Sequence, residues 1–326
     1  MNDDGSYRVA CLDVWPETVQ QVVADVAPAG FEVVFAGSYE APEQHALVAG
    51  ADFVMAGWAA VPAAAIVAAP HLKLIQKWGV GFDRIDLETA RARAVPVAIV
   101  SGVNAPAVAE HAIALMLAVY RRLPLVDAAA RRGVWLKSRM RAEAHMLKGK
   151  TIGILGLGRI GRAVAQRLAG FEAELLCHDI VPPPLAVLER LTVRHVSFEQ
   201  LLVASDVLSV HVPLDAGTRG LIGREALLRM KPGAVLVNTA RGGVVDEAAL
   251  AEAVAEGRLY GAGLDVFATE PLPADAPLLA EERTVVTPHT AGVVFDIVEP
   301  MARHAFDNML RILHGRPLDP DDVVIG

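Results

Sequence analysis

The chain has 326 residues, which is enough for two domains with well-buried cores. Its formal net charge is −8, and no run of Lys and Arg is longer than two residues, which argues against nucleic acid or an anionic membrane surface as a partner. Cys11 and Cys177 are the only cysteines and lie in apolar runs, so we expect no disulfide framework, and we expect a reducing cytoplasm.

Two further sequence features bear on location. Residues 1–8 are acidic and polar, so we expect no secretory leader. Residues 53–72 contain no Asp, Glu, Lys or Arg. Gly57, Pro62 and Pro70 interrupt that stretch, so it predicts a strand, a turn and a short helix, not a membrane span.

The first third of the chain has an alternating strand and helix pattern. We predict a helix near residues 17–27 and strands at residues 7–14, 31–36, 52–56, 72–76 and 96–100. These strands are rich in Val, Ile and Leu without polar alternation, which is typical of a parallel sheet covered on both faces. A long helix follows from about Pro106 to Arg121–Arg122. Residues 123–149 are basic and less periodic, and the pattern assigns them no element.

The second part of the chain repeats the alternation more clearly. We predict strands at residues 151–155, 174–178, 206–212, 234–239, 261–266 and 284–287. Helices are expected after residue 158 and at about 198–204, 247–256 and 296–314. Asp246 is the predicted N-cap of the third of these helices, and Gly257 its stop. The fold class is therefore α/β, with two doubly wound parallel sheets.

A glycine fingerprint lies between the first strand and helix of this second part: Gly156, Gly158 and Gly161, with Arg159 and Ile160 between them. This strand–turn–helix context predicts a dinucleotide site, in which the glycines permit a tight turn, close approach of the pyrophosphate and close helix packing. Asp179 ends the next strand, where a carboxylate accepts ribose hydroxyls and repels a 2′-phosphate. We therefore expect NAD, not NADP.

Three ionisable residues follow in order: Arg241 before Gly-Gly, Glu270 before Pro, and His289 after Pro. Alone, an Arg before Gly-Gly is usually solvated or capping, a Glu before Pro is usually a loop residue, and a His after Pro is more often structural than catalytic. Their sequence blocks resemble those of the D-isomer-specific 2-hydroxyacid dehydrogenases, as do Gly79–Asp83, Asn104 with Ala109–His111, and His211–Leu214. The resemblance covers nearly the whole chain.

The resemblance implies a catalytic triad of Arg241, Glu270 and His289. Arg241 would bind the substrate carboxylate and the keto oxygen, because its guanidinium is a planar fork of donors. His289 would exchange the hydroxyl proton, and Glu270 would favour the charged imidazole and fix its orientation. His111, beside Glu110, could mimic such a pair, but the resemblance makes its helix structural and interfacial.

The resemblance also implies further binding residues. The substrate would contact Lys77, Trp78, Gly79, Val80, Gly81 and Arg241, with the backbone N–H groups of Val80 and Gly81 on its carboxylate. Asp265 would contact the nicotinamide carboxamide. The remaining cofactor contacts would be Val212, Pro213, Thr239, Ala240 and Gly292. No metal is expected.

For the organisation of the chain, the resemblance implies a Rossmann NAD-binding domain, residues 103–292, inserted into a flavodoxin-like substrate domain, residues 1–102 and 293–326. The active site would lie in the cleft between them. A homodimer through the NAD-binding domain is expected, with the long helix and residues 123–149 contributing.

The substrate stays open at this stage. A small acid such as glycerate or glycolate is favoured, and a short-form D-3-phosphoglycerate dehydrogenase is the alternative. Lys77, Trp78 and Trp58 stand where phosphoglycerate enzymes commonly place Arg or a small residue, so a phosphate has fewer donors. Formate dehydrogenases place Gln where Glu270 stands and are discounted. Phosphite oxidation and an NAD-sensing corepressor are less favoured alternatives, and the intact triad argues against an inactive homologue.

Overall fold

The computed structural model describes residues 6–326 and divides the chain into two compact units. Unit 1 consists of residues 1–104 and 294–326, and unit 2 of residues 105–293. Residues 1–5 belong to the predicted substrate domain and to the segment on which the leader prediction depends, and they lie outside the described residues. Within the described part, no helix is both long enough and apolar enough to cross a membrane.

Unit 1 is built on a six-stranded sheet with the strand order β13-β5-β4-β3-β1-β2. Its strands are β1 (Tyr7–Cys11), β2 (Phe31–Phe35), β3 (Phe53–Ala56), β4 (Leu74–Lys77), β5 (Val97–Ala98) and β13 (Val323–Ile325). The first five strands pair in parallel, as predicted. The edge strand β13 was not predicted and is antiparallel to β5, with Val323 opposite Ala98.

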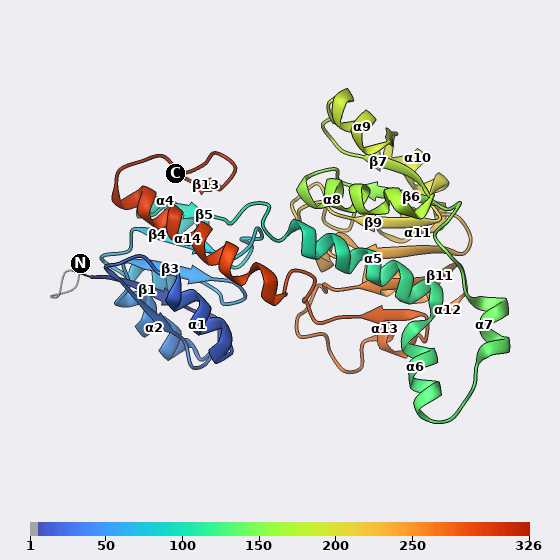
Figure 1. The fold of residues 1–326 in the computed structure, drawn as a ribbon, viewed down its shortest axis with the longest axis horizontal. Coiled ribbons are helices and arrows are strands. Elements are labelled where there is room, and N and C mark those ends of the chain that lie inside the picture. The colour runs from blue at the N-terminus through green and yellow to red at the C-terminus, as the bar shows by residue number, and fades with distance from the viewer. Residues whose placement is uncertain (1–5) are drawn as a thin grey trace. The chain divides into compact units, whose positions relative to one another are not determined.

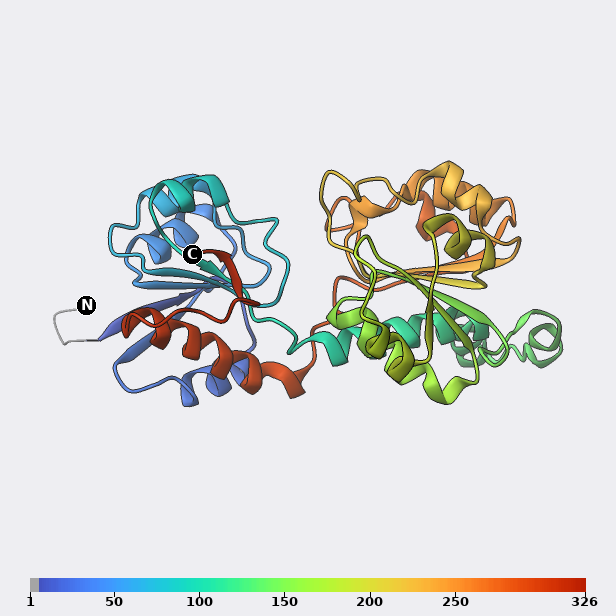
Figure 2. The same cartoon turned by 90° about the horizontal axis from the view of Figure 1, so that it is seen from above.

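Helices cover both faces of this sheet. One face carries α2 (Ala41–Ala49), α3 (Ala63–Val67) and α4 (Leu87–Ala92); the other carries α1 (Glu17–Asp25) and α14 (Val298–Leu313). Figure 2 shows these two layers, with the red α14 beneath the sheet and the light blue and teal helices above it. The buried Phe53 and Phe306 pack in the α1 and α14 layer.

Unit 2 contains a seven-stranded parallel sheet with the strand order β12-β11-β10-β9-β6-β7-β8. Its strands are β6 (Thr151–Leu155), β7 (Glu174–His178), β8 (Val193–His195), β9 (Val207–Val210), β10 (Ala234–Asn238), β11 (Leu259–Leu264) and β12 (Thr284–Val286). The order reverses at β6 and β9, which is the arrangement of a Rossmann sheet.

The helices of unit 2 also form two layers. On one face lie α5 (Ala105–Arg121), α8 (Arg159–Leu168) and α9 (Leu185–Leu191), and on the other α10 (Phe198–Ala204), α11 (Arg224–Arg229) and α12 (Glu247–Ala255). A short α13 (Pro277–Ala280) precedes β12. Two more helices, α6 (Leu123–Arg131) and α7 (Lys137–Glu143), extend beyond the sheet in Figure 1.

The differences from the predicted elements are concentrated in short segments. The sequence pattern placed β6, β7 and α10 at their observed limits, and Asp246 caps α12 by accepting a hydrogen bond from Ala249 N. The short helix expected within residues 53–72 is α3, but the pattern missed β8, β13 and the helices α2, α4, α6, α7, α9, α11 and α13. These elements have three to nine residues, too few for an apolar periodicity to be recognised.

Candidate active site

The glycine fingerprint forms the turn between β6 and α8. Gly156 has a φ of +91°, and Gly158 is the N-cap residue of α8. A Cβ atom on Gly161 would lie 2.1 Å from the carbonyl oxygen of Gly156, so only glycine permits this close packing. A Cβ on Gly158 would meet nothing within 4 Å, and Gly158 and Arg159 are exposed while Ile160 is half-buried. The N-terminus of a ten-residue helix is thus open to an anionic group.

Asp179 lies next to this turn, directly after β7. Its Oδ2 accepts a hydrogen bond of 2.8 Å from the backbone N–H of Leu157. The carboxylate therefore stands beside the phosphate-binding turn, where the predicted ribose contact requires it. Ile180 and Val181, the next two residues, are 92% and 71% exposed and present an apolar surface beside the carboxylate.

Loops after β9 and β10 contribute the other predicted cofactor residues. Val212 and Pro213 follow β9, where Val212 is half-buried and Pro213 is exposed, and Thr239 and Ala240 follow β10. The Thr239 hydroxyl is buried and has no hydrogen-bond partner among the described residues. A buried hydroxyl normally has a partner, so this oxygen fits a site that a polar ligand completes. Thr239, the open α8 N-terminus and Asp179 together fit a dinucleotide.

The three predicted catalytic residues follow three adjacent strands of one sheet. Arg241 comes after β10, Glu270 after β11 and His289 after β12. Because the strands are parallel, their carboxyl ends meet at one edge of the sheet, where ligands bind in open α/β folds. A Cβ on Gly242 would lie 1.9 Å from the carbonyl carbon of Phe267, so the loop that carries Arg241 packs against the loop that leads to Glu270.

Glu270 and His289 form a hydrogen-bonded pair. His289 Nδ1 lies 2.9 Å from Glu270 Oε2, and the backbone N–H of Phe267 donates to Glu270 Oε1 at 2.9 Å. The Glu270 side chain is 14% exposed and that of His289 is 36% exposed. Glu270 thus fixes the Nδ1 side of the ring, which leaves Nε2 as the nitrogen that can exchange a proton with a bound molecule.

The loop that carries His289 is held by Asp265, which is 1% exposed. The carboxylate accepts hydrogen bonds from Thr287 Oγ1 (2.6 Å), Thr290 N (2.8 Å) and Ala291 N (2.8 Å). The Asp265 carbonyl oxygen accepts a 2.8 Å bond from His289 N, and His289 has a φ of +55°. Asp265 therefore fixes the uncommon backbone of the histidine, a role that the sequence did not indicate. Gly292, a predicted cofactor residue, follows this loop and is half-buried.

His111 and Glu110 do not form an acid–base pair. Glu110 pairs with Arg167 of α8 at 3.0 Å. His111 Nε2 lies 2.9 Å from Thr287 Oγ1 and 3.6 Å from Asp265 Oδ1. His111 thus supports the Asp265 cluster from α5, in line with the structural role that the sequence analysis gave it.

Arg241 is positioned by its own loop. Asn238 Nδ2 donates to the Arg241 carbonyl oxygen at 2.9 Å, and Asn238 Oδ1 accepts a 3.0 Å bond from Ala240 N. The guanidinium donates to the Ala240 carbonyl oxygen at 2.6 Å. The buried Asn238, which the sequence analysis did not select, sets the conformation of the loop.

In unit 1, the predicted carboxylate-binding loop follows β4. Val80 and Gly81 are half-buried, and neither backbone N–H donates to an acceptor within residues 6–326. Free donors in a partly buried loop suit an anionic ligand. The loop is anchored on both sides, since Trp78 N donates to Ala56 O (2.8 Å) and Val100 N to Gly79 O (3.0 Å).

The predicted substrate residues Lys77 and Trp78 have protein partners. Lys77 Nζ donates to the carbonyl oxygen of Gly57. The Trp78 ring packs against Trp15, with ring centroids 4.8 Å apart, at the edge of the α1 and α14 core. Asp13 holds the facing loop by accepting from the backbone N–H groups of Gly57, Trp58 and Ala59. The loops after β3 and β4 are thus tied together.

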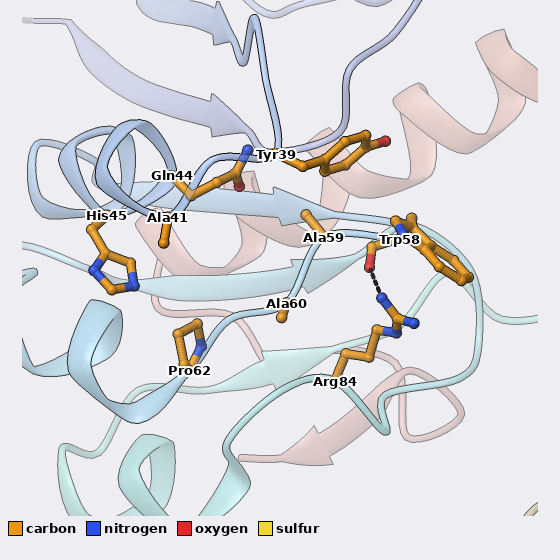
Figure 3. Close-up of a pocket in the computed structure, with 9 residues that line it drawn as sticks. All are labelled: Tyr39, Ala41, Gln44, His45, Trp58, Ala59, Ala60, Pro62 and Arg84. Carbon is orange, nitrogen blue, oxygen red and sulfur yellow. Dashed lines mark hydrogen bonds between the residues drawn. The ribbon is translucent and has the colours of Figure 1, made fainter. Parts of the chain in front are cut away.

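The side chain of Arg84 stacks on the indole ring of Trp58. The Arg84 guanidinium lies 3.7 Å from the ring centroid, and its NH1 group donates to the Trp58 carbonyl oxygen at 3.3 Å. Figure 3 shows this stacking at one end of a pocket. The pocket is lined by Tyr39, Ala41, Gln44, His45, Trp58, Ala59, Ala60, Pro62 and Arg84. Arg84 was not predicted as a site residue, although a cation three residues after Gly81 was visible in the sequence.

The chain is similar to known proteins in both sequence and fold. The model of the D-isomer specific 2-hydroxyacid dehydrogenase, NAD binding domain, matches residues 113–291. The chain belongs to this dehydrogenase family. The predicted family, the α/β fold with a Rossmann domain and the NAD-binding character of that domain are confirmed.

Curated members of the dehydrogenase family include two groups of similar proteins. D-3-phosphoglycerate dehydrogenase of Mycobacterium bovis is 42% identical over 266 residues, which are 82% of this chain and 49% of that protein. The chain thus spans about half the length of this relative. Glyoxylate reductase of Thermofilum pendens is 42% identical over 250 residues, 76% of this chain and 74% of that protein.

The chain is also similar to a solved structure. The NAD-dependent formate dehydrogenase of Staphylococcus aureus, crystallised in complex with NAD, is 30% identical and has a TM-score of 0.85. The similarity covers 98% of this chain and 99% of that one. In residues 6–326 of the chain described here, no group of three or more His, Cys, Asp or Glu side chains could hold a metal ion.

Proposed function

We propose that the chain is an NAD(H)-dependent D-2-hydroxyacid dehydrogenase that interconverts a small 2-hydroxy acid and its 2-keto acid. The observation that carries the proposal is the Glu270–His289 pair, 2.9 Å between Oε2 and Nδ1, at the carboxyl edge of an NAD-binding sheet. A carboxylate-bound imidazole with Nε2 directed away from its partner is the arrangement that general acid–base catalysis at a hydroxyl requires.

The proposed mechanism assigns one task to each residue. In the reductive direction, His289 Nε2 donates a proton to the keto oxygen; in the oxidative direction it removes the hydroxyl proton. Glu270 keeps the other nitrogen protonated and compensates the positive charge of the imidazolium. When bound, the nicotinamide supplies or accepts the hydride at C2 of the substrate.

The substrate carboxylate is proposed to bind two sets of donors. Arg241 offers a planar guanidinium, whose geometry suits two carboxylate oxygens. The N–H groups of Val80 and Gly81 are a second set of proposed donors, because no acceptor within residues 6–326 engages them. Lys77 and Trp78 are proposed to act on the substrate only through this loop, since their side chains contact Gly57 and Trp15.

For the cofactor, we propose that NADH is used in preference to NADPH. Asp179 supports this, because its carboxylate lies beside the phosphate-binding turn and would repel a 2′-phosphate. The proposed cofactor contacts remain those predicted from the sequence. For Asp265 the structure adds the three hydrogen bonds that hold the loop of His289.

A small unphosphorylated acid, such as glycerate or glycolate, is the favoured substrate. The Lys77 ammonium donates to the Gly57 carbonyl oxygen, and Trp58 stands where the resemblance leads us to expect an Arg in phosphoglycerate enzymes. One observation favours the alternative, a phosphoglycerate: Arg84 stacks on Trp58 and has no carboxylate partner within the described residues. A guanidinium that stacks on an aromatic ring and has no carboxylate partner can bind the phosphate group of a substrate.

A panel of keto acids distinguishes these possibilities. The purified protein would be assayed with glyoxylate, hydroxypyruvate and 3-phosphohydroxypyruvate, each with NADH and with NADPH. We expect turnover of hydroxypyruvate or glyoxylate with NADH. A higher kcat/KM for the phosphorylated acid would establish the alternative, and a preference for NADPH would refute the role of Asp179. Absence of turnover across a broad panel would refute the proposed function.

We further propose a cytoplasmic homodimer formed through unit 2. The segment around α6 and α7 exposes Leu123, Val134, Trp135 and Met146, the tryptophan by 81%. The two ends of this segment are fixed, since the buried Arg122, just before α6, pairs with Glu143 at the end of α7 and with Glu282. Exposed apolar side chains on a fixed support suit a protein interface. Sedimentation analysis should give a dimer, and Trp135→Glu should give monomers; a monomeric wild type would refute this proposal.

A further inference from the structure

A chain of buried polar side chains crosses unit 1 beneath the loop of Val80 and Gly81. It consists of Gln76 on β4, Asn308 on α14 and Asp322 just before β13. Their exposed fractions are 0%, 1% and 1%. Buried polar groups destabilise a fold unless they are hydrogen-bonded, so the partners of these three side chains show what they hold in place.

Gln76 is bonded at both ends of its amide. Its Nε2 donates to the carbonyl oxygens of Lys77 (3.1 Å) and Ala98 (3.3 Å). Its Oε1 accepts a 3.1 Å bond from Asn308 Nδ2. Lys77 is the last residue of β4, and the loop follows it directly. The Gln76 amide therefore binds the backbone where the loop begins.

Asp322 binds residues of α14 and of the segment that follows β5. Its Oδ1 accepts a 3.1 Å bond from Ser101 N, and its Oδ2 contacts His304 Nε2 (2.5 Å) and Asn308 Nδ2 (3.3 Å). Its carbonyl oxygen accepts from Ile99 N at 2.9 Å. Between Ile99 and Ser101, Val100 donates to the Gly79 carbonyl oxygen at 3.0 Å. Asp322 thus holds residues 99–101, the segment after β5 that binds the loop at Gly79.

We propose that Gln76, Asn308 and Asp322 are positioning residues that hold the Lys77–Gly81 loop in the conformation that binds the substrate carboxylate. The inference rests on the proposed function. Gln76 fixes the loop at Lys77, and Asp322 fixes it at Gly79 through residues 99–101. Asn308 joins the two, so α14 and the C-terminal tail set where the N–H groups of Val80 and Gly81 lie.

The test compares two glutamines of unit 1. Gln76→Met removes the amide with little change of side-chain length and flexibility. Gln44→Met is the matched control, because Gln44 is also buried (7% exposed) and its Nε2 donates to two carbonyl oxygens, those of Leu12 and Ser38. Neither of these hydrogen bonds of Gln44 reaches the Lys77–Gly81 loop. Both variants should lower Tm to a similar extent, so stability alone cannot explain a difference between them.

We expect Gln76→Met to raise KM for the keto acid about tenfold, the effect of losing a buried hydrogen bond at the binding loop, with little change in kcat or in the Kd for NADH. Gln44→Met should leave KM unchanged. Asn308→Ala, which leaves the bonds of Gln76 to Lys77 and Ala98 in place, should raise KM less. A KM that is unchanged in Gln76→Met, or raised equally in Gln44→Met, would overturn the proposal.

Hydrogen exchange gives a readout that does not depend on activity. Amides in the peptide 78–82 should exchange faster in Gln76→Met and in Asn308→Ala than in the wild type and in Gln44→Met. Unchanged exchange in both variants would overturn the inference even if the wild type is active. An inactive wild type with this exchange pattern would refute the proposed function and leave the positioning role standing. If Gln76→Met does not fold, Asn308→Ala decides by the same two measurements.

Discussion

His289 Nδ1 lies 2.9 Å from Glu270 Oε2, and the second oxygen of Glu270 accepts a hydrogen bond of the same length from Phe267 N. The His289 ring and the Phe267 N–H group therefore bind the two oxygens of one carboxylate. Because the backbone N–H of Phe267 cannot turn away, Glu270 is fixed in position and orients the imidazole in turn. Nε2 is therefore the ring nitrogen that remains for the proposed proton exchange.

The first prediction concerns the proton donor. His289→Asn should lower kcat for keto-acid reduction by at least about 100-fold, because general acid–base catalysis contributes about 10²–10⁴-fold. The Kd for NADH, measured by fluorescence quenching, should change little. A mild loss of kcat would remove His289 from the acid–base role.

Glu270→Gln tests the carboxylate. The amide has one acceptor and one donor group, so it can accept from Phe267 N or from His289 Nδ1, but its NH₂ group then faces the other donor. We expect kcat to fall at least about tenfold because the imidazole loses its orientation and its counter-charge. Glu247→Gln is the control: within residues 6–326 the Glu247 side chain accepts from Ala268 N alone, which an amide oxygen can still do. Equal kcat values for the two variants would contradict the role of Glu270.

Much of the fold and of the site could be predicted because the signals are local. β6 and β7 are continuous apolar runs, and Gly156, Gly158 and Gly161 lie within six residues of each other between a strand and a helix. The order of Arg241, Glu270 and His289 became informative only through the resemblance to a family, since each residue alone has an ordinary structural interpretation.

The supporting contacts had no local signal. Thr287 and His111 are separated by 176 residues, and Gln76 and Asn308 by 232. A buried polar residue in an apolar strand, such as Gln76, does not reveal its partner, because side-chain hydrogen bonds over such separations follow no periodicity. β13 was missed for a related reason: three residues after a Pro- and Asp-rich tail become a strand only by pairing with β5.

A third prediction separates two glycines of one turn. Gly161→Ala should lower Tm strongly or prevent folding, because its Cβ would lie 2.1 Å from Gly156 O. Gly158→Ala has open space around the Cβ, so its Tm should match the wild type. Its Kd for NADH should rise about tenfold or more, because the methyl group blocks the approach of the pyrophosphate. Unchanged NADH affinity in Gly158→Ala would place the cofactor elsewhere.

The last prediction is the pH dependence of stability set by Asp322. Burial pushes the pKa of Asp322 upward, but hydrogen bonds from Ser101 and His304 outweigh it and hold the pKa below its usual value. A carboxyl group with a lowered folded-state pKa stabilises the fold above its unfolded pKa, about 3.9, and this contribution is lost as the pH falls through the folded value.

Asp322→Asn removes this contribution at every pH. The amide also turns an NH₂ group toward Ser101 N or toward the Asn308 amide, both of which are donors. We expect a loss of about 1–3 kcal/mol in the free energy of unfolding at pH 7, measured by urea titration. The difference from wild type should begin to shrink as the pH falls below about 4, where the carboxyl group of the unfolded chain becomes protonated, and should continue to shrink until the pH is below the lower pKa of the folded state. A difference that stays constant from pH 7 to pH 3 would show that Asp322 stabilises unit 1 by packing and not by its charge.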